Sequence, residues 1–399
     1  MPVPAGCSPD SQKPDAKTQH TVGNGMSVPY KVLTAPIFRI ELPLLERTQL
    51  MRTVSRLILS AVILIITGLL AAVAMYLPEF FFGFYTDFSK TVLTAMANVT
   101  GAFPFSLWEI GLVLIVLLAL YFLFKNKKFF SWLCGIVLLV SILVFLFVGL
   151  WGLNHFNPVT VADHVGLEVA EYSKDQLASA TRYMAGQANI WADQVGRDAD
   201  GRMTVDFKGG ADIANDGYDV LAQSNDFFAG SDAPVKKLLS GRLFSYMGFT
   251  GIFMTFTSES NVTPETFSAS LPFTMCHELA HRLTVAAEDE ANFCAFLACR
   301  ENPDPAFQYS CWYSAFLYTY NALYDVDKTA AAEVWNSLSE TVQSDCRRAN
   351  SHYDQFEGEV QEVANKANDA YLKVFKEESG VQSYGEVTDL LIAWYLQNA

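Results

Sequence analysis

Three long runs of apolar residues dominate the hydrophobic pattern in the first half of the chain. Residues 57–77 carry no charge and stop before Pro78, residues 107–124 carry only Glu109 near their start, and residues 129–153 carry none. Each run is long enough to cross a hydrocarbon core of about 30 Å as a helix. Three such runs in close succession are not typical of the core of a soluble protein, so the pattern predicts three transmembrane helices.

Basic residues gather at one end of these runs. They are Arg47, Arg52 and Arg56 before the first run, and Lys125, Lys127 and Lys128 between the second and the third. Because Lys and Arg mark the cytoplasmic ends of spans, the N-terminus is predicted in the cytoplasm and everything after the third run outside it. A cleaved signal peptide is an alternative for the first run, but its length and the poor cleavage site in "AAVAMYLPEF" favour a retained anchor.

After the spans the pattern changes to helical periodicity. Helices are predicted over residues 174–195, 306–324, 328–350, 353–378 and 384–397, around the histidines at positions 277 and 281, from Glu288 to about Glu301, and more weakly over 218–228. A short strand is predicted at "MTVDF" (203–207), and one or two more within 241–264. The fold class is therefore mainly α, with three transmembrane helices followed by a mostly helical α+β domain that contains a small sheet.

The chain is predicted to have three parts. Residues 1–50, rich in Pro, Ser, Gly and Lys, are interpreted as a disordered cytoplasmic tail, unless translation starts at Met26 or Met51. Residues 51–156 form the membrane anchor, and residues 157–399 form an extracytoplasmic domain. That domain carries 35 acidic and 16 basic side chains. Nucleic-acid binding needs a basic face, so a nucleic-acid partner is excluded.

The seven cysteines show no C-x-x-C spacing and indicate no zinc–thiolate site. Most lie in apolar segments such as "ANFCAFLAC", which is typical of buried thiols. A disulfide between Cys299 and Cys311 is conceivable across a helical hairpin, because an extracytoplasmic location permits disulfides.

Candidate chemistry comes from His277-Glu278-Leu279-Ala280-His281, which fits the pattern H-E-x-x-H. On a helix, residues i and i+4 share a face, so both imidazoles can bind one Zn²⁺. Glu278 lies beside the first ligand, where it can act as general base for a zinc-activated water. The alternative is a surface helix with a chance match, but the apolar flanks indicate a buried helix, in which these polar groups need partners.

A catalytic zinc needs a third protein ligand. A metzincin would have histidine at position 287, where this chain has Ala287. Glu288 is the preferred candidate, since Glu288-x-x-x-Asn292 resembles the E-x-x-x-D arrangement of gluzincins, and Glu290 is the second candidate. Asn292 shares a helix face with Glu288 and is expected to hold a ligating histidine. Asp289 is interpreted as an acidic residue that complements the helix dipole.

Peptide hydrolysis also needs a donor for the oxyanion. Tyr384, Tyr371 and His352 are candidates, although each is as compatible with a structural role. Residues 251–258 are either an edge strand that pairs with an extended substrate or an ordinary strand over the zinc helix. His155, just after the third span, is interpreted as an interfacial residue.

Four sequence blocks carry a family resemblance: "WGLNHF", "GFTGIFMTFTSESNV", "HELAHRLTVAAEDEANFCAFLAC" and "GVQSYGEVTDLLIAWY". In this order they resemble bacterial domain-of-unknown-function family 3810, whose members have three spans and resemble zinc metallopeptidases by their H-E-x-x-H. The resemblance implies a zincin-like domain and an acidic residue at Glu259. This chain departs from it at Arg282 and Thr284, where the family usually shows Gln and Gly.

The sequence thus predicts a membrane-anchored, zinc-dependent metallopeptidase with Zn²⁺ as cofactor, acting on a peptide or protein substrate beside a lipid bilayer. The alternative is a non-catalytic zinc-binding membrane protein with a sensing or assembly role. A transporter is not supported, because Glu109 is the single charge within the spans.

Overall fold

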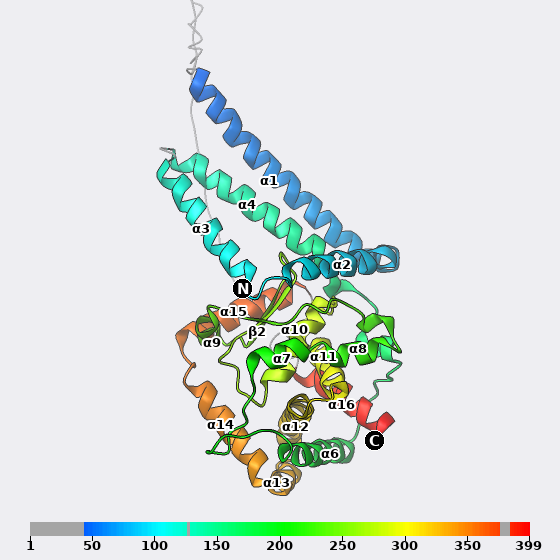
Figure 1. Ribbon diagram of the computed structural model, residues 1–399. Helices are drawn as coiled ribbons and strands as arrows, with labels where there is room; N and C mark the ends of the chain where they lie inside the picture. The colour runs from blue at the N-terminus through cyan, green and yellow to red at the C-terminus, as the bar shows by residue number, and fades with distance from the viewer. Residues whose placement is uncertain (1–43, 126–127, 376–383) are drawn as a thin grey trace, which may run out of the picture. The chain divides into compact units, whose positions relative to one another are not determined.

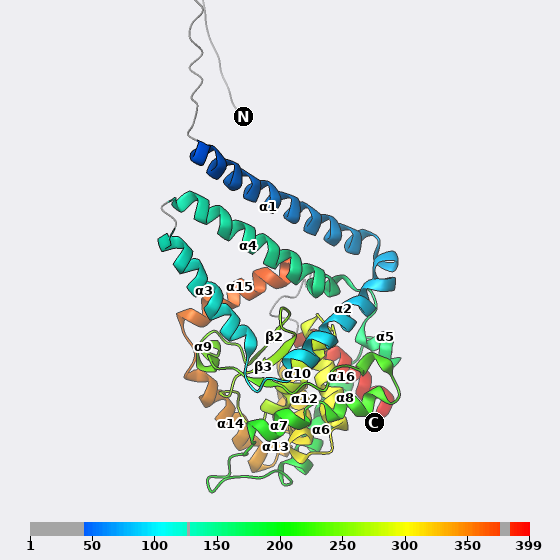
Figure 2. The same ribbon diagram turned by 45° about the horizontal axis from the view of Figure 1, so that its top comes forward.

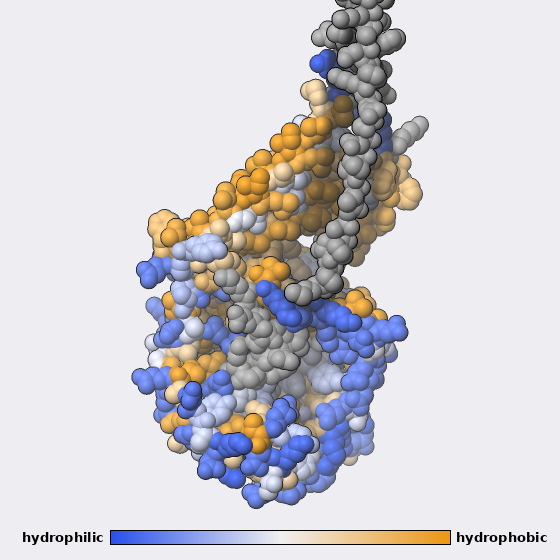
Figure 3. Space-filling view, turned by 180° about the vertical axis from the view of Figure 1, so that it is seen from behind, coloured by the Kyte–Doolittle hydropathy of each residue, from blue (hydrophilic) through white to orange (hydrophobic). Residues whose placement is uncertain are grey.

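The computed structural model describes residues 44–125, 128–375 and 384–399. Within these residues, three helices are long and apolar enough to cross a membrane: α1 (Leu44–Tyr76), α3 (Leu107–Lys125) and α4 (Phe129–Leu150) (Figure 1). Hydrophobic residues gather over them, whereas most of the surface of the following domain is hydrophilic (Figure 3). The predicted multi-pass membrane architecture is confirmed. Helix α1 begins before the predicted span, so residues 44–50 of the predicted tail are helical, and residues 1–43 lie outside the described part.

A fourth helix, α2 (Pro78–Thr100), follows α1 directly and was not predicted from the sequence. Pro78 stands in its first turn, where the missing N–H is no loss. Its buried residues recur every three or four positions along one face: Phe81, Phe82, Tyr85, Ser89, Leu93 and Ala97. The same segment also exposes Phe80, Phe84 and Phe88.

The remaining elements form a mostly helical domain with a small sheet, as predicted (Figures 1 and 2). They are η1 (Gly152–Phe156), α5 (Val161–Val165), α6 (Lys174–Ala192), α7 (Phe207–Ile213), α8 (Asp216–Ala222), η2 (Asp226–Phe228), β1 (Lys236–Lys237), α9 (Gly241–Tyr246), β2 (Gly251–Met254), β3 (Glu259–Val262), α10 (Leu271–Arg282), α11 (Glu288–Glu301), α12 (Pro305–Val326), α13 (Lys328–Ser337), α14 (Glu340–Asp354), α15 (Glu359–Val374) and α16 (Tyr384–Asn398).

Two local predictions were wrong. The segment "MTVDF" forms only an isolated bridge at Met203, because the Asp206 side chain accepts hydrogen bonds from the next backbone N–H groups and starts α7. The predicted helix 328–350 is divided between α13 and α14, because Leu338 is extended and Ser339 caps a new helix. Helix α14 then continues to Asp354, and α15 covers only part of the predicted helix 353–378.

The sheet has the strand order β1-β3-β2, with β1 parallel and β2 antiparallel to β3. Both strands predicted as possible within 241–264 are thus present. Strand β2 is an edge strand, and its residues are only half-buried. Strand β3 is buried, and its Ser260 hydroxyl donates to the carbonyl of Glu278, 2.7 Å away, so the sheet is fixed directly to α10.

Helix α10 lies within the aromatic core of the domain and packs against α11 and α12. The conceivable disulfide between Cys299 and Cys311 is not formed. The Cys299 Sγ atom lies 3.4 Å from Cys276, whereas Cys311 contacts the carbonyl of Phe296. The six cysteines in the described residues are free and buried, as their apolar surroundings predicted.

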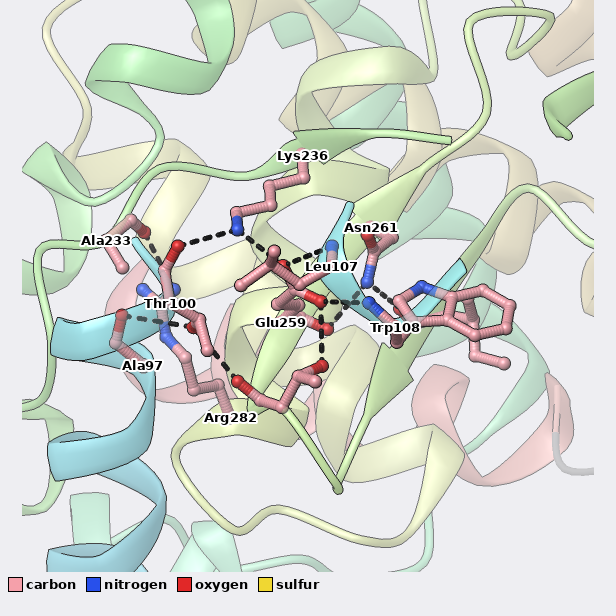
Figure 4. Close-up of polar contacts among 11 residues, drawn as sticks. Ala97, Thr100, Leu107, Trp108, Ala233, Lys236, Glu259, Asn261 and Arg282 are labelled. Carbon is pink, nitrogen blue, oxygen red and sulfur yellow. Dashed lines mark hydrogen bonds and ion pairs between the residues drawn. The ribbon is translucent and has the colours of Figure 1, made fainter. Parts of the chain in front are cut away.

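Polar contacts bind the start of α3 to the sheet (Figure 4). The Glu259 carboxylate accepts hydrogen bonds from the backbone N–H groups of Leu107 and Trp108, at 2.9 and 3.0 Å. It also forms a buried ion pair with Lys236, whose ammonium group donates in addition to the carbonyl of Thr100. A carboxylate at a helix N-terminus satisfies free N–H groups and complements the helix dipole. Glu259 therefore joins the N-terminal end of α3 to the strand that supports α10.

Candidate metal centre

Helix α10 carries both histidines on one face and ends immediately after them. Thr284 has a left-handed backbone, with a φ of 75°. The N–H groups of Thr284 and Val285 return to the carbonyls of His281 and Ala280, the pattern of a Schellman helix terminus. This turn reverses the chain so that α11 begins at Glu288, next to the histidines.

Three donor atoms converge between α10 and α11. The Nε2 atoms of His277 and His281 are 3.1 Å apart. Oxygens of Glu288 lie 3.3 Å from the first and 3.7 Å from the second. Ligands of a tetrahedral zinc at about 2.0–2.1 Å are separated from one another by roughly 3.3 Å. The three side chains therefore fit a single metal ion.

The other nitrogen of each imidazole faces an oxygen acceptor. His277 Nδ1 lies 2.9 Å from Oδ1 of Asn292, and His281 Nδ1 lies 2.8 Å from the carbonyl of Val285. The Tyr318 hydroxyl donates to the same Asn292 oxygen. These partners place the proton on Nδ1 and leave both Nε2 lone pairs directed at the shared point. Two facing lone pairs and a carboxylate repel one another unless a metal ion or a proton lies between them.

The pKa values of the cluster residues fit a set of metal ligands, because His281 is neutral and Glu288 is ionised at neutral pH. Burial lowers the pKa of His281 to about 4. Burial also acts to lower the pKa of His277, but the hydrogen bond and charge of Glu288 raise it above its ordinary value. Loss of hydration opposes ionisation of Glu288, yet the hydrogen bond from His277 and the two imidazoles bring its pKa down to about 2. Glu288 is thus an ionised ligand at neutral pH.

Glu278 lies beside the cluster in a confined, water-poor position. Its side chain is 4% exposed, and no described residue is a hydrogen-bond partner of its Oε2 atom. Burial raises the pKa of this carboxyl group to about 8. Gly251 of the edge strand packs against it so closely that a methyl group there would lie 2.7 Å from the carboxyl carbon. In its ionised form this group has an unused oxygen that can accept a proton from a molecule between the three donor atoms.

None of the other predicted site residues with a described side chain belongs to the three-residue cluster. Glu290, the second candidate ligand, accepts a hydrogen bond from the backbone N–H of Val161 at 3.0 Å and is not part of the cluster. His352 contacts the backbone carbonyl of Glu265. Tyr371 contacts His155, with 3.1 Å between its hydroxyl and Nε2. Asp289 lies in the first turn of α11, as predicted. The side chain of Tyr384 lies outside the described residues.

Sequence reasoning missed the role of Trp151, which follows the last residue of α4. Its indole N–H donates to the carbonyl of His281 over 2.9 Å, and its ring meets the His281 ring edge to face, with centroids 5.8 Å apart. The same indole contacts the ring of His155. Trp151 and His155 both belong to the block "WGLNHF", so that block marks a contact between the end of α4 and α10.

Both departures from the family pattern have a structural explanation. Arg282 is buried, and its guanidinium donates to the carbonyls of Ser231 and Ala233 and to the side chain of Asn215. It thus fixes the back of α10 to the preceding loop. Thr284 adopts the left-handed conformation that glycine adopts more easily, and the turn forms nevertheless.

A cavity of about 420 Å³ lies alongside the N-terminal half of α10. Thr274, one turn before His277, lines it, and so does Tyr318, which contacts Asn292. Its wall is rich in hydroxyl, amide and aromatic groups, with Glu265 as the single charged residue among the lining residues. The cavity reaches α10 one turn before His277, but none of the three cluster residues lines it.

Fold and site together define a multi-pass membrane protein whose helical domain holds an H-E-x-x-H helix and a cluster of two histidines and a glutamate. Residues 84–392 match the family model described as "Protein of unknown function (DUF3810)". The chain therefore belongs to the DUF3810 family, as its sequence blocks suggested. Searches of curated proteins and of solved structures gave no significant match.

Proposed function

We propose that this protein is a membrane-anchored, zinc-dependent metallopeptidase. The observation that carries the proposal is the convergence of His277, His281 and Glu288 on one point, with the buried Glu278 carboxyl group beside it. Two imidazole nitrogens and one carboxylate oxygen are the donor set of many catalytic zinc sites, which leave a fourth position open.

The residues of the chain have separate roles in this proposal. A zinc ion held by the cluster would lower the pKa of a water molecule and polarise the scissile carbonyl. Glu278 accepts the proton of that water and returns it to the leaving amine. Asn292 and the Val285 carbonyl hold the histidine rings in orientation. Strand β2, an edge strand beside Glu278, offers backbone groups to an extended peptide.

The proposed location of this domain is outside the cytoplasm. Arg56, just before the apolar run of α1, donates to the carbonyl of Ser131 at the start of α4, so the two basic clusters of the anchor lie at the same end of the spans. By the positive-inside rule that end is cytoplasmic. Trp151, at the opposite end of α4, contacts the metal helix. The domain then lies on the extracytoplasmic side.

The first test is the zinc content and peptidase activity of the full-length protein in detergent micelles. We expect one zinc per chain in the wild type, loss of zinc in His281→Ala and Glu288→Ala, and full zinc in the matched control Glu290→Ala. Glu278→Gln should keep its zinc and lose hydrolysis of a peptide library by about 10²–10⁴-fold.

Three outcomes would contradict the proposal. A folded wild type without zinc, when purified with zinc present, would exclude a zinc enzyme. Full activity in Glu278→Gln would exclude the general base. One bound zinc with no hydrolysis of any peptide would support instead a non-catalytic zinc-binding protein with a sensing or assembly role.

A further inference from the structure

The outward face of α2 carries a row of exposed phenylalanines. Phe80, Phe84 and Phe88 are 74%, 56% and 48% exposed. Their spacing of four residues places them on one side of the helix. We refer to these three residues as the α2 phenylalanine stripe. Large apolar side chains in a row are costly to keep in water, so such a surface indicates a partner.

The opposite face of α2 is fixed, so the helix cannot rotate to bury the stripe. The Ser89 hydroxyl donates to the carbonyl of Leu150 at the outer end of α4, with a separation of 2.6 Å. The Lys90 ammonium group donates to the carbonyl of Phe227 in the domain, also over 2.6 Å. Further along the helix, Leu93 packs in a buried cluster with Trp151 and Ala286. Helix α2 therefore joins the spans to the domain through one face and exposes the other.

The position of the stripe identifies the partner. Only Leu77 separates α2 from the end of span α1, so the stripe begins where that span leaves the hydrocarbon. Both Figures 1 and 2 show α2 turning away from α1 at this point instead of continuing its direction. Exposed Tyr76 and Leu77 connect the stripe to the apolar surface of the spans. A helix with an apolar row, placed at the end of a span, matches a helix that lies in the membrane interface.

We infer that α2 lies on the outer surface of the bilayer with Phe80, Phe84 and Phe88 inserted among the lipids. The inner face of α2 contacts Ala286, in the loop that follows the metal helix, and Trp151 contacts His281 itself. The metal cluster is therefore held at the membrane surface. In combination with the proposed peptidase function, this position selects peptide segments adjacent to the bilayer, such as the membrane-proximal segments of anchored proteins.

The lipid contact is tested without reference to activity. A nitroxide label is placed at Phe84→Cys or Phe88→Cys in a Cys7→Ser variant of the full-length protein, reconstituted in lipid nanodiscs. Because the other cysteines are buried, the label reports the introduced site. We expect collisions with dissolved oxygen to exceed those with a water-soluble nickel chelate. The control Glu333→Cys, on the exposed surface of α13, should show the opposite order. A label at both α2 positions that behaves like the control would overturn the inference.

The substrate class is tested with one peptide sequence presented in two ways. The peptide is attached to a transmembrane helix by spacers of increasing length in proteoliposomes, or supplied free in solution. We expect the tethered form with the shortest spacers to be cleaved at least tenfold faster, with the rate falling as the spacer lengthens. Equal rates for all forms would reject the selection of membrane-proximal segments. If neither form is cleaved, the peptidase proposal fails, while the nitroxide result still decides the lipid contact.

Discussion

The indole N–H of Trp151, one residue beyond the end of span α4, donates a hydrogen bond to the backbone carbonyl of His281. A residue at the membrane boundary thus supports a predicted metal ligand directly. Replacing Trp151 with Phe keeps an aromatic ring but removes the donor. Removal of a group that orients a metal ligand typically lowers metal affinity by about 10–100-fold. We therefore expect Trp151→Phe to lower the zinc affinity about tenfold, as measured by competition with a chromogenic chelator.

A matched control exists inside the membrane region. Trp132 also donates through its indole N–H to a carbonyl, that of Ala119, at the same distance of 2.9 Å. Trp132→Phe removes the same kind of bond far along the chain from the metal helix. Zinc affinity should remain at the wild-type value in this variant. Equal losses in both variants would mean that the effect of Trp151 comes from general weakening of the anchor.

Gly251→Ala tests the position of Glu278. The added methyl group would overlap the Glu278 carboxyl group, which must then move. A displacement of about 1 Å in a catalytic group costs on the order of 10²-fold in rate. We expect kcat to fall by about that factor, while zinc content stays at one per chain. The control Gly83→Ala adds a methyl group on α2 with no atom within 4 Å, and it should leave both quantities unchanged.

The ion pair between Lys236 and Glu259 is almost fully buried. Removing one partner leaves a charge without its counterpart, which typically costs about 3–5 kcal/mol. Glu259 keeps three other donors, from Leu107, Trp108 and Thr257, so we expect Lys236→Met to lower the free energy of unfolding by about 3 kcal/mol. Denaturant titration in detergent micelles measures this. Lys208→Met, which breaks an exposed pair with Asp212, should leave the free energy of unfolding essentially unchanged, because solvent screens such a pair.

Thr284→Gly is expected to stabilise the protein. The left-handed conformation costs a non-glycine residue about 1–2 kcal/mol, and the greater freedom of glycine in the unfolded chain offsets about 0.5–1 kcal/mol of the gain. The net increase in the free energy of unfolding should be about 0.5–1 kcal/mol in the same titration. Thr284→Ala keeps the strained backbone and serves as the control. A loss of stability in the glycine variant would show that the Thr284 side chain contributes contacts that outweigh the strain.

The sequence predicted best what depends on local spacing. The i, i+4 geometry of His277 and His281 and the start of a new helix at Glu288 follow from the chain itself, and the structure brings these residues together. Apolar length likewise predicted the three spans. The preference for Glu288 over Glu290 also came from local spacing, because Glu288 and Asn292 lie four residues apart and share a helix face.

The sequence did not predict what depends on contacts between distant segments. Trp151 meets His281 across 130 residues, and Glu259 meets Leu107 across 152. Neither contact has a local signature. Helix α2 was missed for another reason, because its segment connects two apolar runs and was treated only as the loop between two spans.

Glu259 also determines how this protein can be assembled. The N–H groups at the start of α3 are synthesised about 150 residues before the carboxylate that satisfies them. Glu109 of the same helix accepts hydrogen bonds from Leu239 and Ser240, which are also made much later. The N-terminal end of α3 therefore lacks these hydrogen-bond partners until the domain has been synthesised. A soluble fragment produced by removing the spans would leave Glu259 with Lys236 and Thr257 as partners but without the two backbone N–H donors of α3.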